Sequence, residues 1–112
     1  MTEELSIFEK IIKRIISADI IFEDDYVIVI KDINPQAPIH YLILPKEKFV
    51  DVNAIPIDKI SIIEKMFVAA QYISKNISGA SQYKLIINNG SAAGQCIFHL
   101  HMHFLSGFEE NI

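Results

Sequence analysis

Cysteine and tryptophan are almost missing from this chain, which has one Cys and no Trp among its 112 residues. A single Cys excludes a disulfide framework and a Cys-rich zinc site. No apolar run approaches the roughly 18 residues that a membrane-spanning helix needs. The first residues, Met1–Glu4, are acidic, whereas a signal peptide begins with positive charge. We therefore expect a cytoplasmic protein with no membrane partner.

Basic residues are also scarce, because ten Lys and Arg stand against fourteen Asp and Glu. The net charge of −4 argues against a nucleic-acid partner, since proteins that bind phosphate backbones normally present a basic face. The hydrophobic fraction of 51% and the charged fraction of 21% are typical of a globular chain. A second core would need roughly another 100 residues, so we predict a single domain over residues 1–112.

Helical and strand patterns occur in an order that predicts an α+β fold. Apolar residues at helical spacing predict one helix over 5–16 and another over 57–78, which lies between Pro56 and Gly79. Strand patterns occupy residues 20–23, 26–31, 39–44, 83–88 and 97–105. Because hairpin connections dominate this order, we expect a mainly antiparallel sheet with two helices.

The second predicted helix is apolar on more than one side. One stripe contains Ile60, Ile63, Phe67, Ala70 and Ile73 or Ser74. The other stripe contains Ile62, Met66, Ala69 and Tyr72. A helix with two apolar sides normally packs against two surfaces. One would be the sheet of its own subunit and the other a partner subunit, so we expect a homodimer.

Three of the four histidines stand at alternate positions of the last predicted strand. Side chains alternate across a strand, so His99, His101 and His103 are expected to share one face. The opposite face is apolar and contains Phe98, Leu100, Met102 and Phe104. That apolar face fixes the register, because a slip of one residue would bury all three imidazoles.

Three explanations of this histidine row are possible. A structural role is common for one buried histidine, but three on one face would each need a separate partner. One zinc ion can bind two imidazoles at i and i+2, yet the strand rise puts His99 and His103 roughly 13 Å apart at the backbone. No acidic residue or Cys lies on this face of the strand, so we predict no metal. In nucleophilic catalysis, a neutral His101 would attack while its neighbours orient it and move protons.

The triad segment also carries a resemblance to a known family. His99-Leu100-His101-Met102-His103-Phe104-Leu105 is similar to the His-φ-His-φ-His-φ-φ signature of the histidine triad (HIT) superfamily, where φ is apolar. Segments 21–24, 32–38 and 40–46 resemble the first half of that family, and Gly94-Gln95 resembles its second half. The resemblance covers about residues 20–107. It is stronger to the Hint branch, the purine nucleoside phosphoramidases, than to the dinucleoside polyphosphate hydrolases.

The resemblance implies a HIT-like fold, a dimer with one continuous sheet, and a nucleotidyl hydrolase or transferase without a cofactor. Such an enzyme would cleave purine nucleoside phosphoramidates or AMP-lysine-type adducts. His101 would attack the α-phosphorus and form a nucleotidyl-histidine, and His103 would contact the phosphoryl oxygens and the leaving group. His99 and His40 would orient the site and relay protons, although His40 could also be a solvated histidine at a strand start. A dinucleoside polyphosphate hydrolase and a non-catalytic nucleotide-binding or scaffold protein are the alternatives.

A purine nucleotide of the AMP or GMP type is the partner that the resemblance implies. Asp32 would accept hydrogen bonds from the ribose hydroxyls, or it is a plain turn residue. The purine would be enclosed by apolar residues that are equally suited to a core, namely Ile21, Phe22 and Ile33. The loop before the triad would hold the phosphate, or would only connect two strands, through Asn88, Gly94, Gln95 and Cys96.

Three features depart from the family pattern. Cys96 stands where Hint relatives usually have Ser, and a thiol is a weaker hydrogen-bond donor. The sequence ends at Ile112 without a Trp, so we expect the C-terminal aromatic of some Hint dimers to be missing. Ser6 and Glu9 stand where several bacterial relatives carry a Cys-x-x-Cys zinc site, so we expect no structural zinc.

Overall fold

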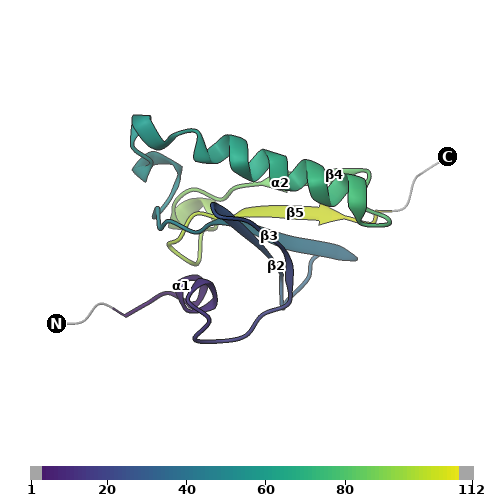
Figure 1. Cartoon of the computed structure of the whole chain (residues 1–112), viewed down its shortest axis with the longest axis horizontal. Helices are drawn as coiled ribbons and strands as arrows, with labels where there is room; N and C mark the ends of the chain where they lie inside the picture. The colour runs from purple at the N-terminus through teal and green to yellow at the C-terminus, as the bar shows by residue number, and fades with distance from the viewer. Residues whose placement is uncertain (1–3, 109–112) are drawn as a thin grey trace.

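A five-stranded antiparallel sheet forms the centre of the protein in a computed structural model, which describes residues 4–108 (Figure 1). The strands are β1 (Ile20–Glu23), β2 (Val27–Lys31), β3 (Ile39–Pro45), β4 (Tyr83–Ile86) and β5 (Met102–Ser106). Their order in the sheet is β1-β2-β3-β5-β4, so the last strand of the chain lies in the interior of the sheet. The predicted α+β fold with a mainly antiparallel sheet is confirmed. The predicted domain, residues 1–112, extends beyond the described residues at both ends.

Two α-helices cover opposite faces of this sheet (Figure 1). Helix α1 (Ile7–Ile12) packs Phe8 and Ile11 against alternate residues of the two central strands β2 and β3. Helix α2 (Ile62–Asn76) packs against the other face. Strands β2 and β3 are therefore buried on both sides, which explains their nearly continuous runs of branched residues.

Both helices are shorter than the sequence pattern predicts. Helix α1 begins after Ser6, which forms a capping box with Glu9, and it ends before Arg14, whose φ is 61°. The predicted helix 57–78 splits into a 3₁₀ turn, Ile57–Lys59, and α2, which begins at Ile62. Ile57 is 87% exposed, so its side chain has no core surface that would favour continuing the helix.

The buried stripe of α2 runs between the two stripes seen in the sequence. Its fully buried residues are Met66, Ala69, Ala70 and Ile73. Phe67 and Tyr72, one from each predicted stripe, are about half exposed. The Tyr72 ring packs 4.8 Å from that of Phe22 on β1, whereas Phe67 stays exposed within the described chain.

The last strand starts at Met102 rather than at residue 97. Strand β3 ends in Pro45, which has no N–H with which to extend the ladder toward residues before Met102. The preceding segment is instead fixed by Leu100, whose N–H donates to the Phe49 carbonyl at 2.7 Å. Phe98 is 48% exposed, so the predicted apolar face does not extend back to it.

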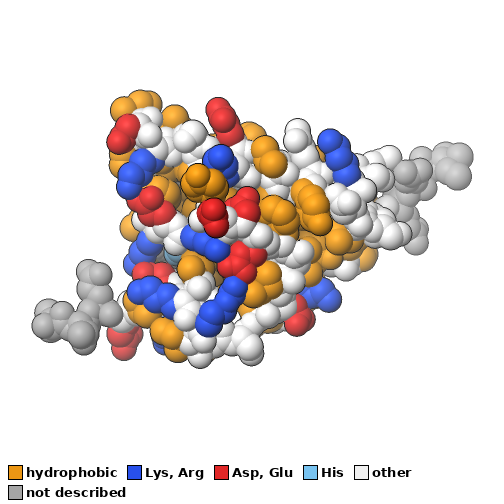
Figure 2. Space-filling view, viewed as in Figure 1, with side chains coloured by type: hydrophobic (Ala, Val, Ile, Leu, Met, Phe, Trp, Pro, Cys, Tyr) orange, Lys and Arg blue, Asp and Glu red, His pale blue; other side chains and the backbone are white. Residues whose placement is uncertain are grey.

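Charged side chains of both signs are distributed over the surface. On the face in Figure 2, Lys and Arg are interspersed with Asp and Glu rather than gathered into one basic patch. No helix within residues 4–108 is long and apolar enough to cross a membrane.

Replacing Phe8 tests whether α1 depends on its docking for stability. A helix of six residues is too short to persist alone, so α1 must be held by its buried side chains. We expect Phe8→Ala to lower the free energy of unfolding by about 3–5 kcal/mol, as large core truncations do. The neighbouring residue Ile7 is exposed and provides the control. Ile7→Ala should change the free energy of unfolding by no more than about 0.5 kcal/mol. Equal losses in urea denaturation would contradict this docking.

Candidate active site

The histidine triad lies on the sheet face that α1 covers. In the β3–β5 register, His103 is opposite Leu42, which belongs to the apolar cluster under α1. The residues that alternate with the histidines, Leu100, Met102 and Phe104, belong to the cluster under α2. The alternation of side chains therefore extends from residue 99 onward, although the regular strand begins only at Met102.

All four histidines of the chain lie close together. The rings of His101 and His103 are 5.2 Å apart between centroids, and His40 on β3 is 5.1 Å beyond His103. The Phe8 ring meets His101 edge-on at 5.0 Å and His99 at 6.0 Å. Helix α1 thus supplies an aromatic wall behind two of the triad rings.

His101 has a defined arrangement of hydrogen atoms. Its Nδ1 lies 2.7 Å from the carbonyl oxygen of His99, and a carbonyl only accepts, so Nδ1 carries the hydrogen. Burial lowers the pKa of His101, although the His99 carbonyl and the Asp32 charge oppose this shift. The ring is consequently neutral near pH 7, and its lone pair is on Nε2. An unprotonated Nε2 is what a nucleophilic imidazole requires.

His99 is fully buried, and its backbone carbonyl is the group that contacts His101. Its Nε2 donates to the Pro45 carbonyl at 2.8 Å. Its Nδ1 is the one fully buried side-chain nitrogen or oxygen without a partner in residues 4–108. Burial lowers the pKa of His99, so the ring is neutral. Its carbonyl orients His101, while its ring packs against Phe8.

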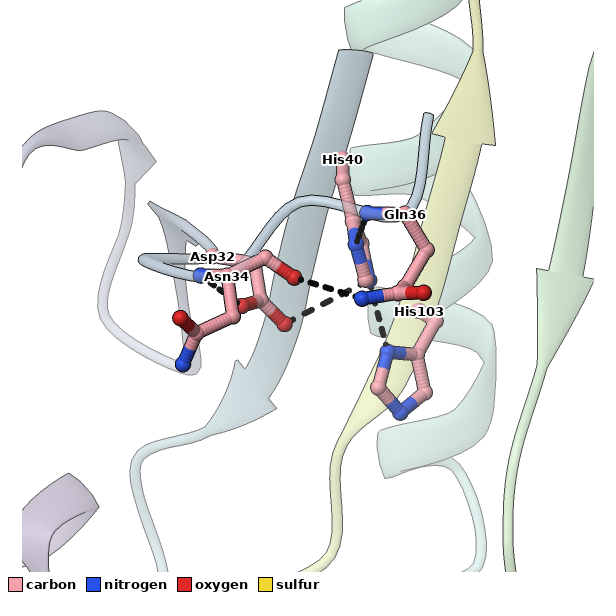
Figure 3. Close-up of polar contacts among 5 residues, drawn as sticks. All are labelled: Asp32, Asn34, Gln36, His40 and His103. Carbon is pink, nitrogen blue, oxygen red and sulfur yellow. Dashed lines mark hydrogen bonds and ion pairs between the residues drawn. The ribbon is translucent and has the colours of Figure 1, made fainter. Parts of the chain in front are cut away.

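His40 is paired with His103, whereas the resemblance grouped it with His99. The Nε2 of His40 is 2.9 Å from Nδ1 of His103 and 3.4 Å from Oδ2 of Asp32 (Figure 3). On the other side of the His40 ring, Nδ1 accepts the backbone N–H of Gln36 at 3.0 Å. Burial lowers the pKa of His103, and the neighbouring rings of His101 and His40 act in the same direction.

Asp32, His40 and His103 are the described residues whose atom types could hold a metal ion. Their potential ligand atoms all lie within 4.8 Å of one another. A metal on Nε2 of His40 would require the ring hydrogen on Nδ1, because ligating histidines normally donate from their other nitrogen. The Gln36 N–H already points at that nitrogen, so two donors would face each other. This hydrogen bond disfavours a metal at the cluster.

A cavity of about 450 Å³ lies between α1 and the sheet, within the size range of small-molecule pockets. Most of its wall is apolar and includes Phe8, Ile11, Leu42 and Ile97. Asp32 and Ile33 lie at its edge, and Ile33 is 86% exposed. Asp32 therefore borders the cavity and also lies beside His40.

The placement of Ile21 and Phe22 differs from the one that the resemblance implies. The register of β1 shifts between Ile20 and Phe22. Ile21 and Phe22 both pack against the cluster under α2, away from the cavity. The core interpretation of these two residues is therefore correct, and their assignment to the purine is wrong.

The loop before the triad is held in shape by two of its own side chains. Asn88 donates from Nδ2 to the Ala93 carbonyl at 2.8 Å. The buried amide of Gln95 accepts the Gly90 N–H at 2.8 Å and donates to the Val50 carbonyl at 2.7 Å. The buried Gln95 amide therefore supports the loop through its partners, whereas Asn88 uses one amide hydrogen within the loop, and its contact with a nucleotide stays a prediction.

Two other positions of this loop are accessible. Gly94 has a φ of 97°, and a Cβ there would lie 3.1 Å from Nδ2 of Asn88, so a larger residue would strain the turn. Cys96 is exposed, and its Sγ is 3.6 Å from the Gly94 carbonyl oxygen. Gly94 and Cys96, on either side of the buried Gln95, can consequently be approached by a ligand from solvent.

Positions 6 and 9, where relatives carry zinc ligands, take part in other interactions. Ser6 and Glu9 form the capping box of α1, and Glu9 pairs with Lys48 at 3.2 Å. The Ser6 backbone N–H, followed by Lys48, lowers the pKa of the Glu9 carboxyl. The absence of a structural zinc at these positions stays a prediction.

Sequence reasoning missed three contributors to the site. The capping pattern Ser6-x-x-Glu9 could have shown where α1 begins, and hence that Phe8 belongs to its buried side. The Gln36 N–H and the Pro45 carbonyl act through the main chain, so their residue types carry no signal of these contacts.

Comparisons with known proteins, by sequence and by structure, agree with one another. A family model described as the HIT domain matches residues 13–110. An uncharacterized HIT-like protein from Synechocystis is 39% identical over 104 residues, which cover 93% of this chain and 91% of that protein. Among solved structures, a HIT family hydrolase from Clostridium thermocellum has a TM-score of 0.91 and 44% identity, covering 99% of this chain and 97% of its own. A histidine triad protein from Clostridium difficile has a TM-score of 0.91 and 33% identity, covering 100% of this chain and 98% of its own.

Burial of neutral His99 predicts a pH-dependent stability. Its pKa is lowered in the folded state, so the unfolded chain binds the proton more tightly, and the stability present above about pH 6.5 is lost as the pH falls below it. Each such histidine contributes a slope of up to about 1.4 kcal/mol per pH unit. His99→Gln removes this titration while keeping a donor for the Pro45 carbonyl. Urea denaturation between pH 5 and 8 should show a shallower slope for the variant, and parallel slopes would contradict this prediction.

Proposed function

The chain belongs to the HIT family, and we propose that it is a Hint-like nucleotidyl hydrolase that acts through a covalent intermediate on His101. Its substrates would be purine nucleoside phosphoramidates or AMP-lysine-type adducts, cleaved at the α-phosphorus. The observation that carries this proposal is the 2.7 Å hydrogen bond from Nδ1 of His101 to the His99 carbonyl, which leaves Nε2 unprotonated. The Clostridium thermocellum relative is described as a HIT family hydrolase, which supports the hydrolase class.

A nucleotide would lie with its base and sugar in the cavity under α1. The apolar wall, with Ile33 at its edge, would cover the purine. Asp32 would accept hydrogen bonds from the ribose hydroxyls, because its carboxylate borders both the cavity and His40. The α-phosphate would then face His101 and His103, with the backbone near Gly94 and Cys96 on its other side.

The reaction would proceed in two displacements at phosphorus. In the first, Nε2 of His101 forms a bond to the α-phosphorus, the bond to the leaving amine breaks, and the amine takes a proton from water. The imidazolium that results still carries hydrogen on Nδ1, and the His99 carbonyl stabilises it. In the second, water attacks the phosphorus and gives up a proton, which neutralises the hydroxide left by the first step, the bond to His101 breaks, and the nucleoside monophosphate leaves. His101 returns to its neutral form.

The two alternatives from the sequence make different predictions about substrates. A dinucleoside polyphosphate hydrolase would cleave such a dinucleotide faster than an adenosine phosphoramidate. A non-catalytic nucleotide-binding or scaffold protein would bind AMP tightly and turn over neither. Each of the three proteins would bind a nucleotide, so turnover rates, rather than binding, discriminate among them.

Replacing His101 tests the covalent intermediate. We expect His101→Ala to lose turnover by on the order of 10³-fold or more, because no other group occupies the position of the nucleophile. Intact-mass analysis after acid-free quenching should find one nucleotidyl group on the wild type and none on this variant. His103→Asn provides the matched comparison, since it keeps the nucleophile and should still acquire the adduct, more slowly. Equal turnover by His101→Ala would refute the mechanism.

A homodimer with a continuous sheet is proposed on the free edge formed by β4. Strand β4 is a terminal strand of the sheet, and its residues Tyr83 and Ile86 are exposed. The other edge strand, β1, carries Glu23 in ion pairs with Arg14 and Lys46, and a charged edge disfavours pairing.

The exposed side of α2 also supports a dimer interface at β4. Ser74 lies on the side of α2 next to β4, because its hydroxyl is 3.5 Å from the carbonyl oxygen of Ser81. Phe67 precedes Ser74 by two helical turns, so it shares this side and is 48% exposed. A partner subunit that pairs with β4 would cover Phe67.

The location of the protein in the cytoplasm and its organisation as a single domain also stay predictions.

Charge substitutions on α2 test the dimer. In sedimentation velocity we expect the wild type to sediment at twice 12.7 kDa and Phe67→Lys to sediment as a monomer, because a buried unpaired charge opposes association. Val68→Lys is the matched control. Val68 is exposed beside Asp24 and Asp25, so a lysine there should leave the dimer intact. A monomeric wild type at micromolar concentration would remove the proposal.

A further inference from the structure

The backbone N–H of Gln36 determines which nitrogen of His40 carries hydrogen. This N–H lies 3.0 Å from Nδ1 of His40, and a backbone amide can only donate. Nδ1 must therefore present a lone pair. The single hydrogen of the neutral ring is consequently on Nε2, the nitrogen that faces His103 and Asp32.

The hydrogen on His40 in turn determines the state of His103. Nε2 of His40 is 2.9 Å from Nδ1 of His103, a normal hydrogen-bond distance, and 3.4 Å from the Asp32 carboxylate. His103 therefore accepts through Nδ1, so its own hydrogen is on Nε2. Figure 3 shows this second nitrogen at the end of the ring that points away from His40.

We propose that Gln36 is a positioning residue, which acts through its backbone N–H and through His40 to hold His103 as a neutral hydrogen-bond donor. The adjacent triad ring is held in the opposite form, since the His99 carbonyl keeps the hydrogen of His101 on Nδ1. Two backbone groups thus give two neighbouring imidazoles opposite tautomers. One presents a lone pair from Nε2 and the other presents an N–H from Nε2.

This assignment gives His103 a specific task, which rests on the proposed function. A neutral imidazole that gave away its only N–H proton would become an anion. His40 cannot replace that proton without becoming an anion itself, because the Gln36 N–H occupies its other nitrogen. His103 therefore stabilises the phosphoryl oxygens by donating a hydrogen bond. The pair of His103 and His40 orients the site and does not carry protons to the leaving group.

The segment that contains Gln36 is built to hold this N–H in place. Its base is closed by the Asp32 N–H, which donates to the His40 carbonyl at 3.0 Å. Within it, Oδ1 of Asp32 accepts the Asn34 N–H at 2.8 Å. Pro35 restricts the backbone immediately before Gln36. The Gln36 side chain is exposed and donates to the Asn34 carbonyl at 3.1 Å.

Nitrogen-15 NMR of the imidazoles tests the assignment directly. In the full-length protein without substrate at pH 7.5, two-bond proton–nitrogen correlations should show His40 and His103 with hydrogen on Nε2 and His101 with hydrogen on Nδ1. His103 found with hydrogen on Nδ1, or as an imidazolium, would overturn the inference. The spectra require no turnover, so the expected spectra in an inactive protein would count against the proposed function alone.

Two substitutions of the same residue separate the N–H from the side chain. Gln36→Ala keeps the N–H and should leave the three tautomers and kcat unchanged within about twofold. Gln36→Pro removes the N–H, so both tautomers of His40 and His103 should coexist, and kcat should fall about tenfold with little change in KM. If Gln36→Pro does not fold, His40→Asn replaces it, because the shorter amide can accept the Gln36 N–H but cannot reach His103. Unchanged His103 signals in the folded variant would overturn the inference.

Discussion

The antiparallel pairing of β3 with β5 is the constraint on which the site depends. This register sets Leu42 opposite His103 and His40 opposite Leu105, so both imidazoles are on the α1 face and come within hydrogen-bond distance. A shift of one residue would send the triad rings under α2, where Phe104 and Met102 now pack. The apolar residues between the histidines therefore determine the site as firmly as the histidines do.

Burial gives the site its chemical character. His99 and His101 are buried and His103 is half-buried, and this burial lowers the pKa of each ring and keeps it neutral near pH 7. Under the proposed function, an anionic phosphate would then be met by directed N–H groups and one lone pair rather than by positive charge. Phe8 contributes to this enclosure from α1, so the short N-terminal helix matters to the chemistry as well as to the core.

Much of the fold could be predicted from the sequence, because strand alternation and turn residues are local properties. The face that carries the histidines was also predictable. The apolar residues at 100, 102 and 104 must face the core, so the histidines that alternate with them must be on the opposite face. The ends of elements were not, because Pro45 and the lack of a packing surface at Ile57 act through neighbours that the sequence does not reveal. Gln95 has a polar side chain next to the triad, but its partners lie in other segments, so its structural task could not be predicted.

The contact made by Gln36 has a consequence for how this site would diverge among relatives. Nearly every residue type supplies the same main-chain amide, so the side chain at this position can drift without penalty while the contact persists. Proline alone lacks this N–H, so it is the exchange that would remove the contact. Under the proposed role, a position that tunes the site through its main chain would look unconstrained when side chains are compared, and only the rarity of proline there would show that it matters.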